Sequence, residues 1–261
     1  MYVTDARGRK LTVGAPPRRV VSLVPSITET LFEIGAGPIV VGVTEFCVFP
    51  ADGVAALPHL RGTKNPDVAR IRELRPDLVH MNVEENLERD AVAIEAFTPV
   101  FLSEPKSPHD VVQLINTLGV LHGCRETASA LASSLRKELD RDQLAPFTFA
   151  CPIWKSPWMW CGGDTYAANV IQAIGGENVL AEHDRYPAID LPAVLALQPD
   201  LLLLPDEPWA FTEADAEELR SAGFKNVLGP FPGHLITWHG ARTLPGLQFL
   251  RAAVESFLHT R

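Results

Sequence analysis

Short apolar runs alternate with longer amphipathic stretches along this chain, and the alternation predicts parallel β-strands connected by α-helices. The runs are almost continuously hydrophobic, which is typical of strands in a sheet that is covered on both faces. They fall into two series, residues 20–24, 39–43, 77–81 and 99–102, then residues 147–153, 200–204 and 235–237. The sequence therefore predicts an α/β fold with two parallel sheets, each flanked by helices.

A segment without glycine or proline separates the two series. Residues 124–143 carry aliphatic side chains three or four positions apart, which places them on one face of a helix. These side chains belong to Ala128, Leu131, Leu135 and Leu139. About twenty residues at about 1.5 Å each form a rod of about 30 Å. We therefore expect an N-terminal lobe at 1–123, a rigid connecting helix at 124–143 and a C-terminal lobe at 144–261.

The two halves share two short repeats in the same order. Residues 68–79 and 191–202 each combine a helical pattern with Pro-Asp-Leu and an apolar strand, since the residue before proline avoids the helical region. Residues 31–37 and 170–176 each have the pattern of a helix closed by glycine. The repeats predict two similar lobes, although Pro-Asp-Leu before a strand is also common in unrelated α/β proteins.

Composition narrows the class of protein. Hydrophobic residues make up 46% and charged residues 21%, as in a globular protein with a sizeable core. The formal net charge of −9 argues against a nucleic-acid partner. No apolar run is long enough to span a membrane, and the first ten residues lack the apolar core of a signal peptide. We expect a cytoplasmic protein as written, or a periplasmic or cell-surface protein if the sequence is a trimmed mature form.

The tryptophans are the first candidates for ligand binding. Open parallel sheets bind ligands beyond the carboxyl ends of their strands. All five tryptophans follow predicted strands of the second half, namely Trp154, Trp158, Trp160, Trp209 and Trp238. Flat aromatic surface suits a large, planar, mostly apolar ligand. We therefore predict a ligand cleft lined by these rings, while the alternative for each single ring is that it closes the edge of the core.

Polar and aromatic residues in three other loops extend the candidate site. The ligand-binding candidates there are Phe46, Cys47, Phe49, Asn82, Glu84, Glu85, His239 and Arg242. The Cys47 thiolate is a candidate ligand for a soft metal, or else a small apolar thiol packed under the two phenylalanines. Glu84 and Glu85 suit acid–base or metal chemistry, or else form a solvated loop. Arg242 suits a ligand carboxylate or phosphate, or else a surface ion pair.

Common catalytic and metal-binding motifs are missing from the sequence. No Gly-x-Gly-x-x-Gly follows a predicted strand, and the phosphate loop, the Gly-x-Ser-x-Gly elbow and His-Glu-x-x-His are all absent. The four cysteines form no Cys-x-x-Cys pair. His80 lies within an apolar strand and is expected to be a core residue. These observations favour a binding protein over an enzyme, with no catalytic residues.

Residues 19–29, 41–43, 75–79 and 175–179 together resemble the helical-backbone metal receptors. These are the class III substrate-binding proteins of ABC transporters for cobalamin, haem and iron-siderophores. The matches span residues 18–258 in the family's order. The resemblance implies two α/β lobes joined by one rigid helix, a ligand in a shallow cleft between them and an ABC permease as partner. The cobalamin branch is the most similar, because its ligand is held largely by aromatic rings.

Two features depart from the cobalamin receptors. There, a glutamate early in the helix before each Pro-Asp segment docks onto the permease, whereas alignment places Ala69 and Pro192 at those positions. In addition, residues 62–67, 84–86 and 238–242 resemble a signal-less subgroup of the family. The sequence therefore leaves two outcomes open: either the chain docks onto a transporter, or it does not.

Three hypotheses about function follow. The leading one is a non-enzymatic binder of a corrinoid, haem or iron chelate, held as ligand rather than as cofactor. The second is a cytoplasmic metal-binding protein or enzyme that reuses the receptor fold, with Cys47, Glu84 or Glu85 and His239 as working groups. The third is a degenerate receptor that binds nothing tightly.

Overall fold

The computed structural model describes residues 2–12 and 14–259 and divides the chain into two compact units. Unit 1 contains the residues up to Pro105 together with Asp110–Ser134. Unit 2 contains Lys106–His109 and the residues from Leu135 onward. The lobe limits expected from the sequence stay a prediction, and their outer ends, residues 1 and 261, lie outside the described residues.

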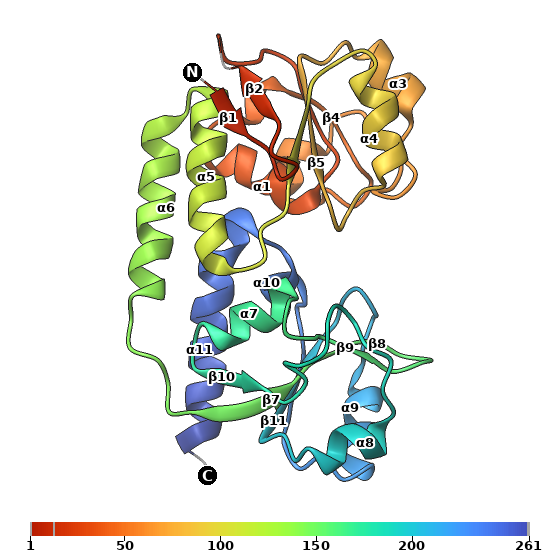
Figure 1. Ribbon diagram of the computed structural model, residues 1–261, viewed down its shortest axis with the longest axis vertical. Helices are drawn as coiled ribbons and strands as arrows, with labels where there is room; N and C mark the ends of the chain where they lie inside the picture. Colours follow the sequence, from red (N-terminus) through yellow and green to blue (C-terminus); the bar gives the residue numbers. More distant parts are fainter. Residues whose placement is uncertain (1, 13, 260–261) are drawn as a thin grey trace. The chain divides into compact units, whose positions relative to one another are not determined.

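Unit 1 is built around a parallel four-stranded sheet in the order β4-β3-β5-β6 (Figure 1). The strands are β3 (Val20–Ser22), β4 (Val40–Val43), β5 (Leu78–Asn82) and β6 (Val100–Ser103). The elements between them are α1 (Pro25–Glu33), η1 (Gly37–Ile39), α2 (Ala51–Val54), α3 (Val68–Glu73) and α4 (Glu88–Glu95). The four strands predicted in the first half of the sequence are confirmed. A terminal hairpin of β1 (Tyr2–Thr4) and β2 (Lys10–Thr12) was not predicted.

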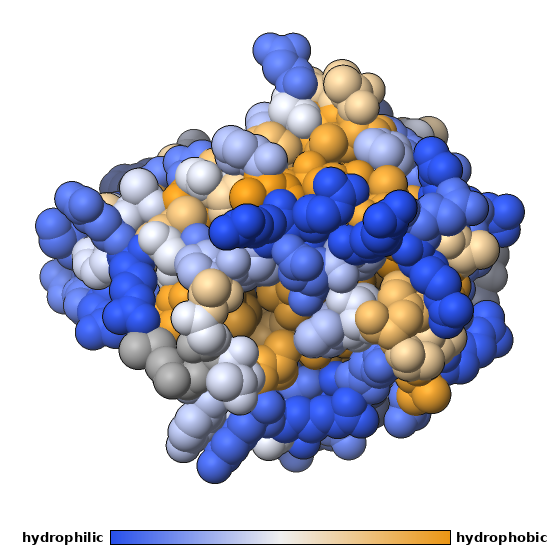
Figure 2. All heavy atoms as spheres, turned by 90° about the horizontal axis from the view of Figure 1, so that it is seen from above, coloured by the Kyte–Doolittle hydropathy of each residue, from blue (hydrophilic) through white to orange (hydrophobic). Residues whose placement is uncertain are grey.

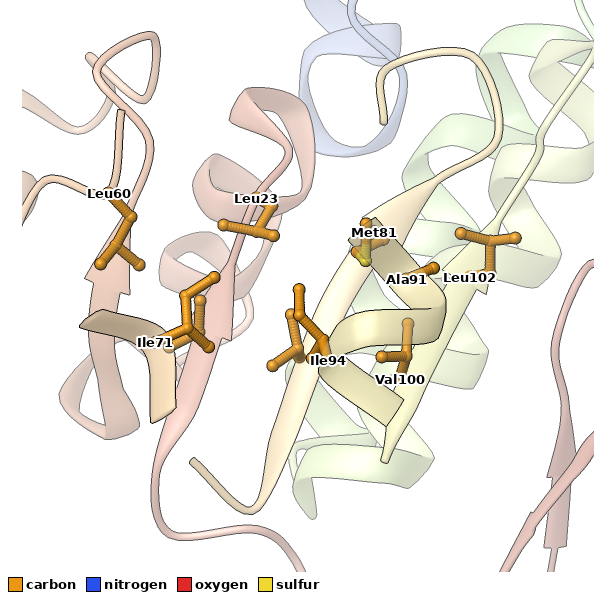
Figure 3. Close-up of a cluster of buried hydrophobic side chains, with 10 residues drawn as sticks. Leu23, Leu60, Ile71, Met81, Ala91, Ile94, Val100 and Leu102 are labelled. Atoms are coloured by element: carbon orange, nitrogen blue, oxygen red, sulfur yellow. The ribbon is translucent and has the colours of Figure 1, made fainter. Parts of the chain in front are cut away.

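One face of this sheet packs against α3 and α4. Successive strand side chains point to opposite faces, so Met81 of β5 and Leu102 of β6 share the face that meets Ile71 of α3 and Ile94 of α4. Figure 3 shows these side chains converging in one buried cluster. His80 points to the other face, where its ring meets His122 at the end of α5 (Pro108–His122).

Unit 2 repeats the same topology, with a parallel sheet in the order β10-β7-β11-β12. The strands are β7 (Phe147–Ala150), β10 (Gly176–Asn178), β11 (Leu201–Pro205) and β12 (Val227–Phe231). The connecting helices are α7 (Tyr166–Gln172), α8 (Leu191–Ala196) and α9 (Glu213–Ser221). In both sheets the second strand along the chain lies at one edge and the fourth at the other. The prediction of two similar α/β lobes is therefore confirmed.

The second series of predicted strands needs two corrections. Residues 235–237 are helical, in α10 (His234–Thr237), and the fourth strand is β12 instead. Gly229 and Pro230 interrupt the apolar pattern of β12 in the sequence. The structure accommodates Pro230 because β12 is an edge strand, where a missing backbone donor is tolerated. The run 147–153 is also split, into β7 and a separate strand β8 (Pro152–Trp154), which pairs antiparallel with β9 (Met159–Trp160).

Equivalent side chains support the repeat in both units. The Asp77 carboxylate accepts hydrogen bonds from the Arg18 and Arg19 amides, at 2.7 and 3.0 Å. The Asp200 carboxylate likewise accepts one from the Thr148 amide at 2.8 Å. Each aspartate thus ties the start of one strand to the start of the first strand of its parallel sheet. The Pro-Asp repeat therefore holds strands in register.

The long helix predicted between the halves is α6 (Arg125–Leu139). It ends at Leu139 rather than at residue 143. Gly119 of α5 allows close packing against Ala128 of α6, and the two helices run side by side (Figure 1). In unit 2, the buried Glu138 carboxylate accepts a hydrogen bond at 2.9 Å from Arg251 of the last helix, α11 (Thr243–His259).

Hydrophilic side chains cover most of the face shown in Figure 2. Among the residues that the structure describes, no helix combines the length and the apolar character that crossing a membrane requires.

Candidate functional site

The aromatic surface of unit 2 is formed by Trp154, Trp158 and Trp209, which come from two chain segments. Trp154 and Trp158 lie on the β8–β9 hairpin, and Trp209 lies in the loop after β11. The rings of Trp154 and Trp209 meet edge to face, with centroids 4.9 Å apart. Phe211 stacks on Trp158 at 5.7 Å with an interplanar angle of 7°, and also contacts Trp209. The structure therefore brings together three of the five candidate tryptophans on one side of the hairpin.

Exposure separates these rings from Trp160. Trp154 is 40% exposed, and Trp158 and Trp209 are partly buried. Trp160 is fully buried, and its indole N–H donates to the Ile189 carbonyl at 2.9 Å. The ligand-binding role expected for Trp160 is therefore corrected, because this ring belongs to the core and stacks beneath Trp158.

Lys155 fixes the hairpin to α9. Its ammonium group lies 2.6 Å from a carboxylate oxygen of Asp215 and 2.6 Å from one of Glu218. It also lies 5.5 Å from the ring centroid of Trp158, within the range of a cation–π contact. Hydrogen bonds to the two carboxylates raise the pKa of Lys155, so it is charged at neutral pH. These contacts hold the aromatic surface in place before any ligand arrives.

Replacing Lys155 by methionine is expected to loosen the hairpin while keeping the apolar stem of the side chain. Partly exposed ion pairs stabilise by about 1 kcal/mol or less, so amide hydrogen exchange in residues 152–160 should become about five-fold faster. Mass spectrometry of exchanged peptides measures this change. The same substitution at Lys225, an exposed lysine of unit 2, is the control. Equal exchange in both variants would show that the ion pairs do not hold the hairpin.

Trp238, His239 and Arg242 follow α10 in the same unit. His239 is buried, with its ring 6.0 Å from that of Tyr166, and burial lowers its pKa to about 4. Its imidazole is therefore neutral and packed rather than presented to a ligand. Trp238 is partly buried and its ring lies 5.8 Å from that of His234. Arg242, also partly buried, lies in the short helix η2 (Gly240–Arg242).

Glu207, which the sequence reasoning missed, connects these residues to the loop of Trp209. Its carboxylate accepts hydrogen bonds from the Thr237 hydroxyl, at 2.8 Å, and from Trp238. Burial raises the pKa of Glu207, while the charge of Arg242 acts in the opposite direction. A signal was present in the sequence, because Glu207 is the second residue after β11. Its partners lie some thirty residues further on, so their proximity required the fold.

The loop after β4 in unit 1 carries Phe46, Cys47 and Phe49. The Phe46 ring is 57% exposed and Phe49 is partly buried, whereas Cys47 is buried. The Thr28 hydroxyl donates to the Cys47 sulfur at 3.1 Å, and the Thr44 hydroxyl contacts it at the same distance. Burial raises the pKa of the Cys47 thiol, which favours the neutral form. The structure therefore fits the packed-thiol interpretation, and we do not carry Cys47 forward as a metal ligand.

The loop after β5 is shaped by Asn82. Its buried side-chain oxygen accepts hydrogen bonds from the amides of Glu84 and Glu85, at 2.8 and 3.2 Å. Lys64 donates to the Glu84 carbonyl. Asn82 is thus a loop-forming residue, and the two glutamates that it presents are partly exposed. Among the described residues, no group of three or more His, Cys, Asp or Glu side chains is arranged to hold a metal ion.

The two positions aligned with the docking glutamates lie in corresponding places. Ala69 is exposed in the first turn of α3, and Pro192 is exposed in the first turn of α8. The carboxylates nearest in sequence, Asp67 and Asp190, cap these helices by accepting hydrogen bonds from the amides of Arg70 and Ala193. Each helix start therefore has a capping carboxylate two residues before the expected position.

Solved structures with the same architecture are periplasmic ligand-binding proteins. The vitamin B12-binding protein BtuF of Vibrio cholerae has a TM-score of 0.78 at 19% identity, over 92% of this chain and 98% of that one. The heme-binding protein RhuT from Roseiflexus sp. RS-1 has a TM-score of 0.79 at 22% identity, over the same shares. The two α/β units therefore define the two-lobed fold of the class III substrate-binding proteins.

Sequence comparison identifies the family. Residues 20–223 match the family described as periplasmic binding protein, and the chain belongs to that family. The ABC transporter substrate-binding lipoprotein YvrC of Bacillus subtilis is 25% identical, over 97% of this chain and 84% of that protein. A vitamin B12-binding protein of Yersinia pestis is 26% identical, over 71% of this chain and 69% of that protein. The family resemblance predicted from the sequence is confirmed.

Proposed function

We propose that this chain binds a large, planar, metal-containing macrocycle or chelate of the corrinoid or haem type and supplies it to an ABC permease, without catalysing a reaction. One observation carries the proposal, namely the surface of Trp154, Trp158 and Trp209 in unit 2. Three partly exposed indoles on loops at the carboxyl end of a parallel sheet provide flat apolar area where such sheets bind ligands. The vitamin B12-binding and heme-binding proteins that this chain resembles support this class of ligand.

The anchored hairpin supports binding to a preformed surface. Lys155 is held by two carboxylates, and Trp158 is stacked between Phe211 and Trp160. Side chains that are already ordered lose little conformational entropy when a ligand arrives, so more of the contact energy appears as affinity. Phe46, which is exposed after β4 in unit 1, stays a ligand-binding candidate predicted from the sequence. Trp238 and Arg242, joined through Glu207, are proposed as further contacts in unit 2.

The alternative of a metal-binding enzyme has less support. Its working groups would be Cys47, Glu84 or Glu85 and His239. The thiol of Cys47 and the imidazole of His239 are both buried and favour their neutral forms. We therefore develop only the binding function.

Titration of the purified protein with cyanocobalamin, cobinamide and hemin tests the proposal. At least one should quench the tryptophan fluorescence with a Kd of about 1 μM or below, since rings of the ligand would lie against the exposed indoles. Free N-acetyltryptophanamide, titrated in parallel, corrects for light absorbed by the ligand. If all three ligands leave the corrected fluorescence unchanged at about 50 μM, ligands of this class are excluded.

The ABC permease as partner, and a location outside the cytoplasm, are proposed by comparison with the relatives. YvrC is named as an ABC transporter lipoprotein, and BtuF and RhuT as periplasmic proteins. These names favour a site of action outside the cytoplasm and give no support to the cytoplasmic location expected from the sequence. Because Ala69 and Pro192 replace the docking glutamates, we propose that any permease contact uses other residues on α3 and α8.

A further inference from the structure

Cys151 and Cys161 stand opposite each other at the base of the β8–β9 hairpin. Cys151 follows β7 directly, and Cys161 follows β9 directly. Pro152 pairs with Trp160 in the antiparallel register, so the next pair outward is Cys151 with Cys161. The Cys161 amide donates to the Cys151 carbonyl at 2.9 Å, which continues the ladder by one pair. The two cysteines are therefore cross-strand neighbours.

This arrangement matches the geometry that a disulfide requires. Directly opposed residues in a hydrogen-bonded antiparallel pair have Cα atoms about 5.5 Å apart. Disulfides span Cα separations of about 4.4–6.8 Å, most often about 5.5–6 Å. The two thiols are buried, and the side chains of directly opposed residues in an antiparallel pair point to the same side of the hairpin.

We propose that Cys151 and Cys161 form a reversible disulfide that closes the base of the hairpin carrying Trp154 and Trp158. The oxidant is a low-molecular-weight disulfide such as oxidised glutathione. Because both thiols are buried, and the neighbouring Cys161 thiol and burial raise the pKa of Cys151, the reaction proceeds during local opening of the hairpin base. One cysteine then loses its proton and attacks a glutathione sulfur, which releases one glutathione thiolate. The second cysteine loses its proton and attacks the mixed disulfide, which releases the other. In total, two protein thiols are oxidised to one disulfide and one glutathione disulfide is reduced to two thiols, which carry the two protons.

The remaining cysteines provide internal controls. Cys47 and Cys124 belong to unit 1, and the Cys47 sulfur already accepts a hydrogen bond from the Thr28 hydroxyl. Cys124 is partly exposed and should react readily with an alkylating reagent. The inference concerns the covalent state of the hairpin alone, so it does not depend on the proposed ligand.

Redox titration of the full chain tests the proposal. The protein is equilibrated in glutathione buffers of increasing oxidation, quenched with acid, unfolded, alkylated and digested. We expect one peptide pair joined through Cys151 and Cys161, with Cys47 and Cys124 alkylated. The equilibrium constant for closing this disulfide should be about 100-fold larger in the folded chain than in urea, because the fold holds the two thiols together. Oxidised protein should also unfold about 5 °C higher than reduced protein.

Variants separate the disulfide from general effects of oxidation. Cys161→Ala should abolish the cross-linked peptide and the rise in Tm on oxidation, whereas Cys124→Ala should preserve both. The proposal is overturned if wild-type protein has four alkylated cysteines in the most oxidising buffer. Equal closing constants in folded and urea-unfolded protein would overturn it as well.

Discussion

Replacing Trp154 and Trp209 together by alanine is expected to raise the Kd for the macrocycle about 100-fold. The ring centroids of Trp154 and Trp209 lie 4.9 Å apart, and Trp154 is 40% exposed. Buried tryptophans are frequent hot spots of binding, and two of them at about 1–2 kcal/mol each give about 3 kcal/mol, which is about a 100-fold change in Kd. Isothermal titration calorimetry with the ligand that binds the wild-type chain measures the change.

A matched control separates this effect from general loss of aromatic surface. Tyr2, in the terminal hairpin of unit 1, is 57% exposed. The Tyr2→Ala variant should bind as the wild type does. Because Trp209 packs against the core of unit 2, the circular dichroism spectrum of the double variant is recorded first to establish that it is folded. A folded double variant with wild-type affinity would remove Trp154 and Trp209 from the proposed ligand surface.

The second large effect is loss of stability in acid, centred on His80 and His122. The two Nε2 atoms lie 2.9 Å apart, and both rings are buried. Among the described residues, the Nδ1 atoms of both rings have no hydrogen-bond partner. Burial lowers the pKa of His122 from 6.5 to about 4, and burial together with the neighbouring ring lowers that of His80 well below 6.5.

The sign of the pH dependence follows from these shifts. Above pH 6.5 both histidines are neutral in the folded and unfolded states, so their contribution is constant. Below pH 6.5 the unfolded chain binds protons that the folded chain does not bind, so the free energy of unfolding decreases as the pH falls. For His122 the loss reaches about 3 kcal/mol at pH 4. Urea unfolding followed by circular dichroism between pH 7.5 and pH 4 measures the dependence.

The variant His122→Gln isolates the contribution of one ring. Its amide can hydrogen-bond to His80 but does not titrate, so the slope of unfolding free energy against pH between 6.5 and 4 should fall by about one proton. His183→Gln, at an exposed position, should leave the slope unchanged. An unchanged slope in the His122 variant would assign the acid sensitivity to other groups.

Most strands could be predicted from the sequence because the signal for each is a short run of apolar residues in the strand's own sequence. The runs at 20–24, 77–81 and 200–204 each overlap a strand that is buried on both faces, so no other interpretation of the pattern competes. β12 could not be predicted in the same way. Gly229 and Pro230 carry the signal of a turn, and only the position of β12 at the sheet edge makes them acceptable.

The candidate site was less predictable, because its outcome depends on contacts between distant segments. Trp158 and Trp160 are two residues apart, yet Trp158 lies at the surface whereas Trp160 is buried beneath it. The Trp160 ring contacts Phe224, and its indole N–H donates to the Ile189 carbonyl. Cys47 looked reactive beside two phenylalanines, but hydroxyl groups of Thr28 and Thr44 surround its sulfur. Residue type indicates possible chemistry, while burial and hydrogen-bond partners decide whether the group can reach a ligand.

The β8–β9 hairpin is an insertion that distinguishes one unit from the other. In unit 1 only Leu23 and Val24 separate β3 from α1, whereas in unit 2 the whole hairpin lies between β7 and α7. It leaves and rejoins the shared architecture at neighbouring points, so the part that carries Trp154 and Trp158 can change while Trp160 keeps its place in the core. This short stretch of chain can therefore be exchanged, in evolution or by design, to alter which ligand the protein recognises.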